Sequence, residues 1–154
     1  MLALGCDHGG YPLMKEVIDY LEKNGIEYKN FGTYSDASVD YPEYGKAVAN
    51  AVAAGECEQG ILICGTGIGI SITANKVKGI RCALCGDVFS AKATREHNDA
   101  NILAMGARGS RCCRASRTSR SFQGRSPADR DPRSAGKEVN TYHRGKICPG
   151  ESFL

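Results

Sequence analysis

The stretch that decides the fold runs from residue 60 to residue 71 and reads GILICGTGIGIS. Its apolar run ends at Cys64, and glycines follow at every second position, at 65, 67 and 69. This order predicts a short buried strand, a glycine-rich turn and then a helix. Glycines let backbone N–H groups converge on an anion, and a helix N-terminus adds positive potential. The sequence therefore predicts a thiol beside an anion-binding turn.

On either side of this stretch the chain alternates between strand-like and helix-like patterns up to residue 108. We expect strands at 2–6, 26–31, 60–64, 80–85 and 102–105, and helices that begin near residues 13, 41, 68 and 87. Strands and helices that alternate across short loops predict a Rossmann-like three-layer α/β/α sandwich around a five-stranded parallel sheet. Ligands of such sheets bind at the carboxyl ends of the strands, which places Cys6-Asp7-His8 and Cys64-Gly65-Thr66 on one rim.

Composition favours a protein of the cytoplasm. The mean hydropathy of the 154 residues is −0.33, and no apolar run reaches the length of a membrane span. The first ten residues, MLALGCDHGG, lack the basic region of a signal peptide. Several of the eight cysteines (Cys6, Cys64, Cys82 and Cys85) lie in strand-like runs, which favours reduced, buried thiols over a disulfide framework.

Residues 109–154 have a different character from residues 1–108. They carry a net charge of +6, against −3 for the first part, with eight arginines, seven serines and few large aliphatic side chains. We find no helical or alternating period in them and predict a disordered tail after a domain of residues 1–108. A basic nucleic-acid-binding tail is one alternative. Translation out of frame after Arg108 is another.

Four motifs in residues 1–108 give a family resemblance. They are CDHGG at 6–10, DYPEYG at 40–45, GILICGTGIGISITANKVKGIRCAL at 60–84 and REHNDANILAMGAR at 95–108. Together they resemble type B ribose-5-phosphate isomerase, whose family includes the lactose-pathway galactose-6-phosphate isomerase subunits. The resemblance implies interconversion of ribose 5-phosphate and ribulose 5-phosphate through a cis-enediolate, in the pentose phosphate pathway. It also implies a homodimer or a dimer of dimers, with no cofactor, no metal, no membrane and no nucleic acid.

The resemblance assigns three catalytic residues, Cys64, Thr66 and His97. Cys64 would be the base that moves the proton between two carbons, since Ile70 stands where another version of the site has a carboxylate. Thr66 and backbone N–H groups of the turn would hold the enediolate oxygen; the donors are Gly65, Gly67, Ile68 and Gly69. His97 would open the sugar ring, with Asn98 beside it, across a dimer interface.

Four further residues are implied to bind the substrate. Asp7 would orient sugar hydroxyls, His8 would lie toward the phosphate, Tyr41 would form a pocket wall, and Arg108 would contact the phosphate. Some of these assignments also have a purely structural alternative. Asp7 could cap a helix, with no role for His8, and Tyr41 could be a packing residue. His97 could stand at the end of its helix because the helix dipole favours a histidine there.

Other interpretations of the same residues are weaker. Cys64 could be an inert buried thiol. A dinucleotide-binding turn is disfavoured because Ile70 stands where the last glycine of that fingerprint belongs. Cys82-x-x-Cys85 could be half a zinc site, but no second pair has suitable spacing, so we assign both thiols to the core. Allose 6-phosphate or galactose 6-phosphate could be the substrate, or the chain could be a non-catalytic sugar-phosphate-binding remnant.

The resemblance stops after Arg108. The family continues with an amphipathic helix, a GGRH-type phosphate-binding segment and a terminal helix that packs on the partner subunit. We recognise none of the three in residues 109–154. We therefore expect weakened phosphate binding, an uncovered apolar face of the sheet and an impaired dimer.

Overall fold

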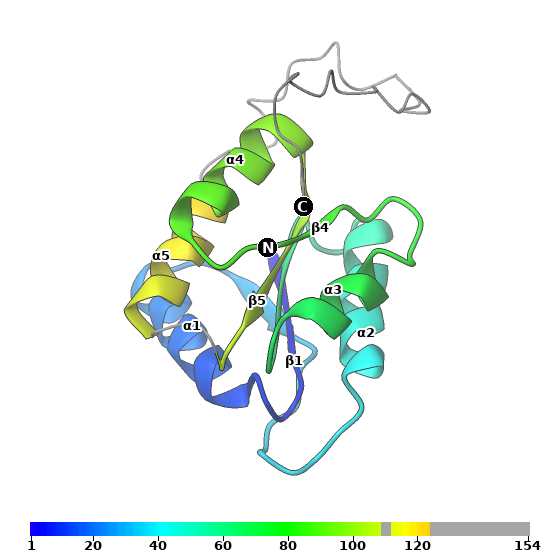
Figure 1. Cartoon of the computed structure of the whole chain (residues 1–154), viewed down its shortest axis with the longest axis vertical. Helices are drawn as coiled ribbons and strands as arrows, with labels where there is room; N and C mark the ends of the chain where they lie inside the picture. The colour runs from blue at the N-terminus through cyan, green and yellow to red at the C-terminus, as the bar shows by residue number, and fades with distance from the viewer. Residues whose placement is uncertain (109–111, 124–154) are drawn as a thin grey trace, which may run out of the picture.

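The computed structural model of the chain describes residues 1–108 and 112–123 (Figure 1). Strands and helices alternate along it. The strands are β1 (Leu2–Cys6), β2 (Tyr28–Asn30), β3 (Gln59–Cys64), β4 (Cys82–Leu84) and β5 (Ile102–Gly106). The helices are α1 (Tyr11–Lys23), α2 (Tyr41–Ala53), α3 (Ile68–Ala74), α4 (Val88–Asn98) and α5 (Cys112–Gln123). None of these helices is long and apolar enough to cross a membrane.

The strands form one parallel sheet in the order β2-β1-β3-β5-β4. Helices α1, α4 and α5 cover one face, and α2 and α3 cover the other (Figure 1). This confirms the predicted three-layer sandwich. The second and fourth strands are shorter than expected, because only Tyr28–Asn30 and Cys82–Leu84 pair with a neighbouring strand.

Alternation along the central strands divides the core into two layers. In β3, Ile61 and Ile63 face α1 and α5, whereas Leu62 and Cys64 face α2 and α3. All four side chains are buried, as expected for a parallel sheet covered on both faces. Cys64 therefore ends its strand on the side of the α2–α3 layer.

Local signals in the sequence set most helix ends. Asp87 accepts a hydrogen bond from the N–H of Ser90 at 2.8 Å, which confirms it as the cap of α4. Helix α1 ends at Lys23, just before Asn24-Gly25, and Gly25 has a φ of +64°, which a glycine adopts without strain. Prolines at 12 and 42 lie in the first turns of α1 and α2.

The edge strand β4 is held by a side chain as well as by its neighbour β5. Asn75, which follows α3, donates a hydrogen bond to the carbonyl of Cys82 at 2.8 Å and accepts one from its N–H at 2.9 Å. The Asn75 amide also donates to the carbonyl of Ser71 at 3.0 Å. One side chain thus fixes the end of α3 to the outer side of β4.

Helix α5 corrects our expectation that no helix follows Arg108. It packs against α1 and α4, and its Phe122 side chain is fully buried under the guanidinium of Arg95, 5.5 Å from the ring centre. The face of the sheet that we expected to be uncovered therefore carries a helix. Residues 109–111 and 124–154 lie outside the described residues, so disorder and out-of-frame translation stay predictions for them.

Candidate active site

The turn between β3 and α3 is closely packed. Gly67 has a φ of +78°, a conformation that side chains disfavour. A Cβ atom at Gly67 would lie 2.5 Å from Cδ1 of Leu84 and 2.8 Å from the carbonyl carbon of Met105. Both the backbone conformation and the lack of space therefore require glycine at this position.

Cys64 lies at the base of this turn with its sulfur facing a backbone donor. The N–H of Gly67 donates to Sγ of Cys64 at 3.0 Å, and the cysteine is only 5% exposed. We predicted the Gly67 N–H as a donor to a bound anion, whereas the structure directs it to Sγ of Cys64.

The neighbouring thiol, Cys6, has a different environment. Burial, with a smaller effect of the Asp7 carboxylate, raises the pKa of Cys6 to about 12 from 9.0. Its Sγ lies 3.9 Å from the carbonyl oxygen of Thr33, to which it donates. Cys6 is therefore a protonated core thiol at neutral pH and cannot be a second base.

The loop after β1 lies directly against the glycine turn. Asp7 accepts a hydrogen bond from the N–H of Gly10 at 2.8 Å through Oδ1 and is almost fully buried. A Cβ atom at Gly9 would lie 3.3 Å from the nitrogen of Gly65. The structure thus brings residues 7–9 and the turn after Cys64 onto one rim, as predicted.

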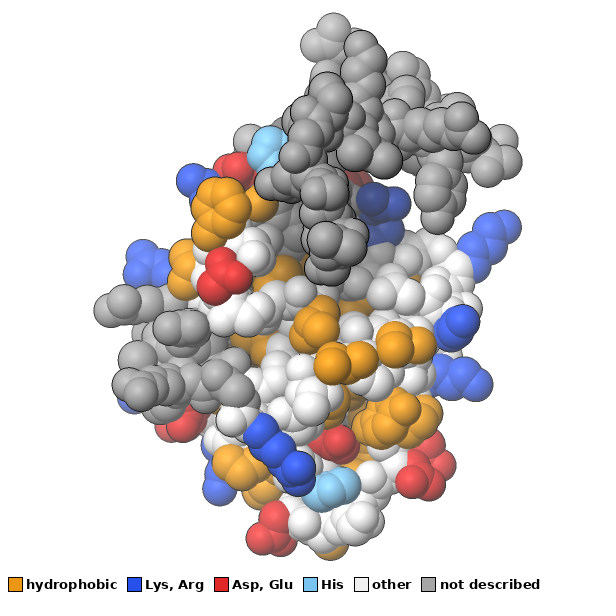
Figure 2. Space-filling model, in the orientation of Figure 1, with side chains coloured by type: hydrophobic (Ala, Val, Ile, Leu, Met, Phe, Trp, Pro, Cys, Tyr) orange, Lys and Arg blue, Asp and Glu red, His pale blue; other side chains and the backbone are white. Residues whose placement is uncertain are grey.

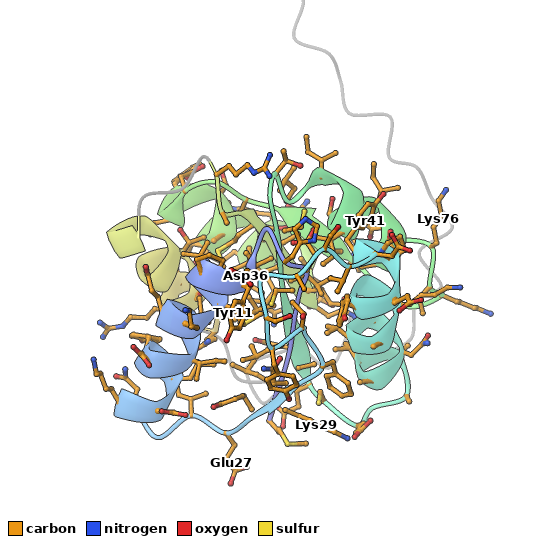
Figure 3. The ribbon with its side chains drawn as sticks, turned by 90° about the horizontal axis from the view of Figure 1, so that it is seen from below. Tyr11, Glu27, Lys29, Asp36, Tyr41 and Lys76 are labelled. Atoms are coloured by element: carbon orange, nitrogen blue, oxygen red, sulfur yellow. The ribbon has the colours of Figure 1, made fainter. Side chains whose placement is uncertain are left out.

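His8 connects this rim to the loop between β2 and α2. The N–H of Val39 donates to Nδ1 of His8 at 3.2 Å, so a neutral His8 carries its proton on Nε2. Figure 3 looks onto the end of the molecule where this loop, which carries Asp36, runs between α1 and α2. The hydrogen bond leaves the Nε2–H of His8 as a donor.

Tyr41 and Arg108 border the glycine turn. A Cβ atom at Gly69 would lie 2.7 Å from Cζ of Tyr41, so the aromatic ring packs on this glycine. Arg108 donates its backbone N–H to the carbonyl of Gly65 at 3.0 Å, and its Nε would lie 3.4 Å from a Cβ at Gly65. An aromatic wall and a guanidinium thus lie at this turn.

The other donors of the turn differ in their availability. The N–H of Ile68 donates to Oγ1 of Thr66 at 3.3 Å, within the turn itself. Gly69 lies in the first turn of α3, where N–H groups have no acceptor inside the helix. Ile70 is fully buried in the core, so no proton acceptor stands at its position.

His97 and Asn98 lie at the opposite edge of the sheet from Cys64. They end α4, and the carbonyl of Asn98 accepts a hydrogen bond from Nε of Arg81, just before β4 begins. Cys64 instead pairs with Gly106 at the carboxyl end of β5, about 13 Å along the strand from Ile102 at about 3.3 Å per residue. A single chain therefore does not bring His97 and Cys64 together.

A cavity of about 330 Å³ also lies at this amino edge, and Asn98, Arg81, Thr94 and Asn75 help to line it. It is separated from the glycine turn by the length of the sheet, so it does not belong to the rim that holds Cys64.

The structure adds two residues to the site that the sequence did not indicate. A Cβ atom at Gly106 would lie 2.6 Å from the carbonyl oxygen of Thr66, so the end of β5 packs directly against the backbone of the turn. Leu84, at the end of β4, lies against Gly67. Both contacts join segments far apart in the sequence, and glycine or leucine at a strand end is too common to signal them.

The described residues contain no group of three or more histidine, cysteine, aspartate or glutamate side chains that could hold a metal ion. Cys82 and Cys85 lie in different core layers, as predicted for a strand. Burial is the main cause that raises the pKa of Cys82 to about 12 and that of Cys85 to about 11. Both are therefore protonated thiols at neutral pH.

Comparison with known proteins gives consistent similarities. A family model described as Ribose/Galactose Isomerase matches residues 2–136. Ribose-5-phosphate isomerase B of Escherichia coli is 51% identical over 107 residues, which cover 70% of this chain and 72% of that protein. Galactose-6-phosphate isomerase subunit LacB of Clostridium acetobutylicum is 44% identical over 108 residues, 70% of this chain and 62% of LacB. The structure of Clostridium thermocellum ribose-5-phosphate isomerase B has a TM-score of 0.79 at 51% identity, over 80% of this chain and 83% of that chain.

Proposed function

The chain belongs to the ribose/galactose isomerase family, and we propose on this basis that it is an aldose–ketose isomerase that interconverts ribose 5-phosphate and ribulose 5-phosphate. The single observation that carries the proposal is the Cys64 thiol, which ends β3 and accepts the N–H of Gly67 at 3.0 Å. A base is what the reaction needs, because a proton must pass from C2 of the aldose to C1.

In this mechanism Cys64, as the thiolate, takes the proton from C2 and later returns it to C1. Charge develops on the enediolate oxygen between these two steps. The N–H groups of Gly65 and Gly69 and the hydroxyl of Thr66 are the proposed donors to that oxygen. The N–H groups of Gly67 and Ile68 already donate within the turn, which makes them weaker candidates than we expected.

The same rim supplies groups for the rest of the sugar phosphate. Asp7 keeps its second carboxylate oxygen for sugar hydroxyls, since Oδ1 accepts the N–H of Gly10. The Nε2–H of His8 and the guanidinium of Arg108 are proposed donors to the phosphate. Tyr41, which packs on Gly69, is proposed as the wall of the pocket. The proton transfers require no cofactor and no metal.

Ring opening requires a second copy of the chain in this proposal. His97 is exposed at the end of α4, at the far edge of the sheet from Cys64, so only another copy can bring a His97 and its Asn98 to the thiol. Exposed apolar side chains of Ile68, Ile72 and Leu84 near the turn offer a surface for such a homodimer (Figure 2 shows hydrophobic side chains gathered over α3). A dimer of dimers is compatible with the same site.

We also propose that the protein works in the cytoplasm. The five cysteines whose side chains the structure describes are free thiols, which suits a reducing compartment.

The direct test is turnover of ribose 5-phosphate by the purified chain and by its Cys64→Ala variant. We expect the variant to lose at least about a thousandfold in kcat, because alanine cannot accept the proton from C2, while its circular dichroism is unchanged. Cys82→Ala is the matched control, since its sulfur lies at the other edge of the sheet, and it should keep its activity. Turnover by Cys64→Ala would remove Cys64 as the base.

A second substrate is favoured by one observation, the 44% identity to the LacB subunit. Galactose 6-phosphate or allose 6-phosphate would then be the better substrate of the same site. Values of kcat/KM for the three sugar phosphates decide the question, and we expect ribose 5-phosphate to give the highest. A chain that converts none of them would be the non-catalytic remnant.

A further inference from the structure

We propose that Leu84 is a positioning residue for the thiol chemistry, which holds the Gly67 peptide so that its N–H faces the Cys64 sulfur. The inference rests on the proposed role of Cys64 as the base. Leu84 ends β4, and its Cδ1 lies so close to Gly67 that a Cβ there would be only 2.5 Å away.

The glycine turn is clamped from two sides. On one side lies the backbone of β5, because a Cβ at Gly67 would be 2.8 Å from the carbonyl carbon of Met105 and 3.0 Å from the nitrogen of Gly106. Gly106 in turn touches the carbonyl of Thr66. On the other side lies Leu84, whose Cδ1 is the one side-chain atom among the three atoms nearest to a Cβ at Gly67. The backbone of β5 is paired on both sides in the sheet, so Leu84 is the contact that a substitution can remove.

The orientation of this peptide matters because Gly67 is the donor to the sulfur. Gly67 has a left-handed conformation, with a φ of +78°, and as a glycine it has no side chain that could fix the orientation of this peptide. A wall of van der Waals contact is then what keeps the N–H within 3.0 Å of Sγ. Hydrogen bonds to an ionised acceptor are among the stronger ones, so loss of this alignment disfavours the thiolate.

Leu84 is suited to a test because it is not a core residue. It is 46% exposed, so its truncation removes the wall with little loss of buried area. Phe89, at the start of α4, is the matched control: it is a larger apolar side chain, 82% exposed, and it is not among the three residues nearest to a Cβ at Gly67. Leu84→Met restores an apolar side chain of similar length at the same position.

The experiment measures the rate at which iodoacetamide alkylates Cys64 as a function of pH, with the Cys64 peptide followed by mass spectrometry. Leu84→Ala should move the midpoint of the rate profile upward by about half to one pH unit, which lowers the rate at pH 7 about three- to tenfold. Phe89→Ala should keep the midpoint of the unchanged chain, and Leu84→Met should restore it. Leu84→Val serves as a second variant, with a smaller upward movement, if Leu84→Ala does not fold.

The outcomes separate this inference from the proposed function. An unchanged midpoint in Leu84→Ala overturns the positioning role, even in an active isomerase. An equal movement in Phe89→Ala also overturns it, because the effect would then come from the exposed apolar surface in general. A chain without isomerase activity that still shows the Leu84 effect keeps the contact and loses the proposed function.

Discussion

At the residue scale, the described cysteines differ in what faces each sulfur. Cys64 accepts a backbone N–H from a neighbouring turn, whereas Cys6 is buried beside the Asp7 carboxylate. Two thiols at the ends of adjacent strands therefore have different surroundings. The base role is proposed for Cys64 alone, because burial keeps the Cys6 thiol protonated at neutral pH.

Stability at alkaline pH should report on Cys6. Its folded pKa of about 12 lies above the ordinary value of 9.0, so its stabilising effect is complete below about pH 9 and is lost as pH rises toward 12. Over this window the free energy of unfolding should fall by at most about 1.4 kcal/mol per pH unit for this thiol. Urea unfolding at pH 7, 9 and 10.5 checks the slope. In Cys6→Ala the decline should be shallower, and an equal slope in both proteins would contradict the assignment.

Residue-level prediction from sequence succeeds where the chemistry is local. Cys64 and Asp7 each follow a strand directly, so the rule for parallel sheets places both on one rim. The close packing of Leu84 and Gly106 against Gly67 could not be predicted in the same way, because both residues come from other strands. Composition alone gave no reason to select either residue.

At the scale of elements, α5 is the helix that the sequence did not reveal. Its stretch is rich in serine and arginine, and it packs against α1 and α4 with the Phe122 side chain fully buried. The hydroxyl of Ser119 and the amide nitrogen of Gln123 are buried without a hydrogen-bond partner. The helix therefore buries an apolar side chain together with polar groups that burial disfavours.

Substitutions in α5 should have opposite effects on stability at its apolar and its polar buried side chains. Phe122→Ala should lower the free energy of unfolding by about 3 kcal/mol, since it empties a fully buried site. Ser119→Ala should leave the stability equal or raise it, because it removes a buried hydroxyl without a partner. Urea unfolding measures both, with the exposed Arg120→Ala as the control. A loss of stability in Ser119→Ala comparable to that in Phe122→Ala would refute this account of α5.

At the scale of the whole molecule, one sheet separates the two halves of the proposed site. Cys64 lies at the carboxyl edge and His97 near the amino edge, so the chemistry predicts a composite site between two copies. The sequence predicted the fold well because each strand and helix has its own periodic pattern. It could not show that the edges are this far apart, since that follows from the direction of α4 against β5.

Co-expression of two inactive variants tests the composite site. Cys64→Ala and His97→Ala should each be inactive alone, whereas random pairing in a symmetric dimer gives heterodimers with one intact site. The mixture should recover about a quarter of the activity of the unchanged chain. Measurement of ribose 5-phosphate turnover, with size-exclusion chromatography to verify the dimer, gives the answer. Activity of His97→Ala alone, or no recovery in the mixture, would exclude a site shared in this way.

The side chain of Asn75 has a consequence for how two copies can meet. Free edges of sheets invite another strand, because their N–H and carbonyl groups lack partners. Asn75 occupies both of these groups on Cys82, where a strand from a second molecule would have to bind. The Asn75 amide thus makes the two hydrogen bonds that a neighbouring strand would make with Cys82, and a further strand cannot pair with β4 at this residue. A continuous intermolecular sheet that pairs with Cys82 on β4 is therefore not available to this protein.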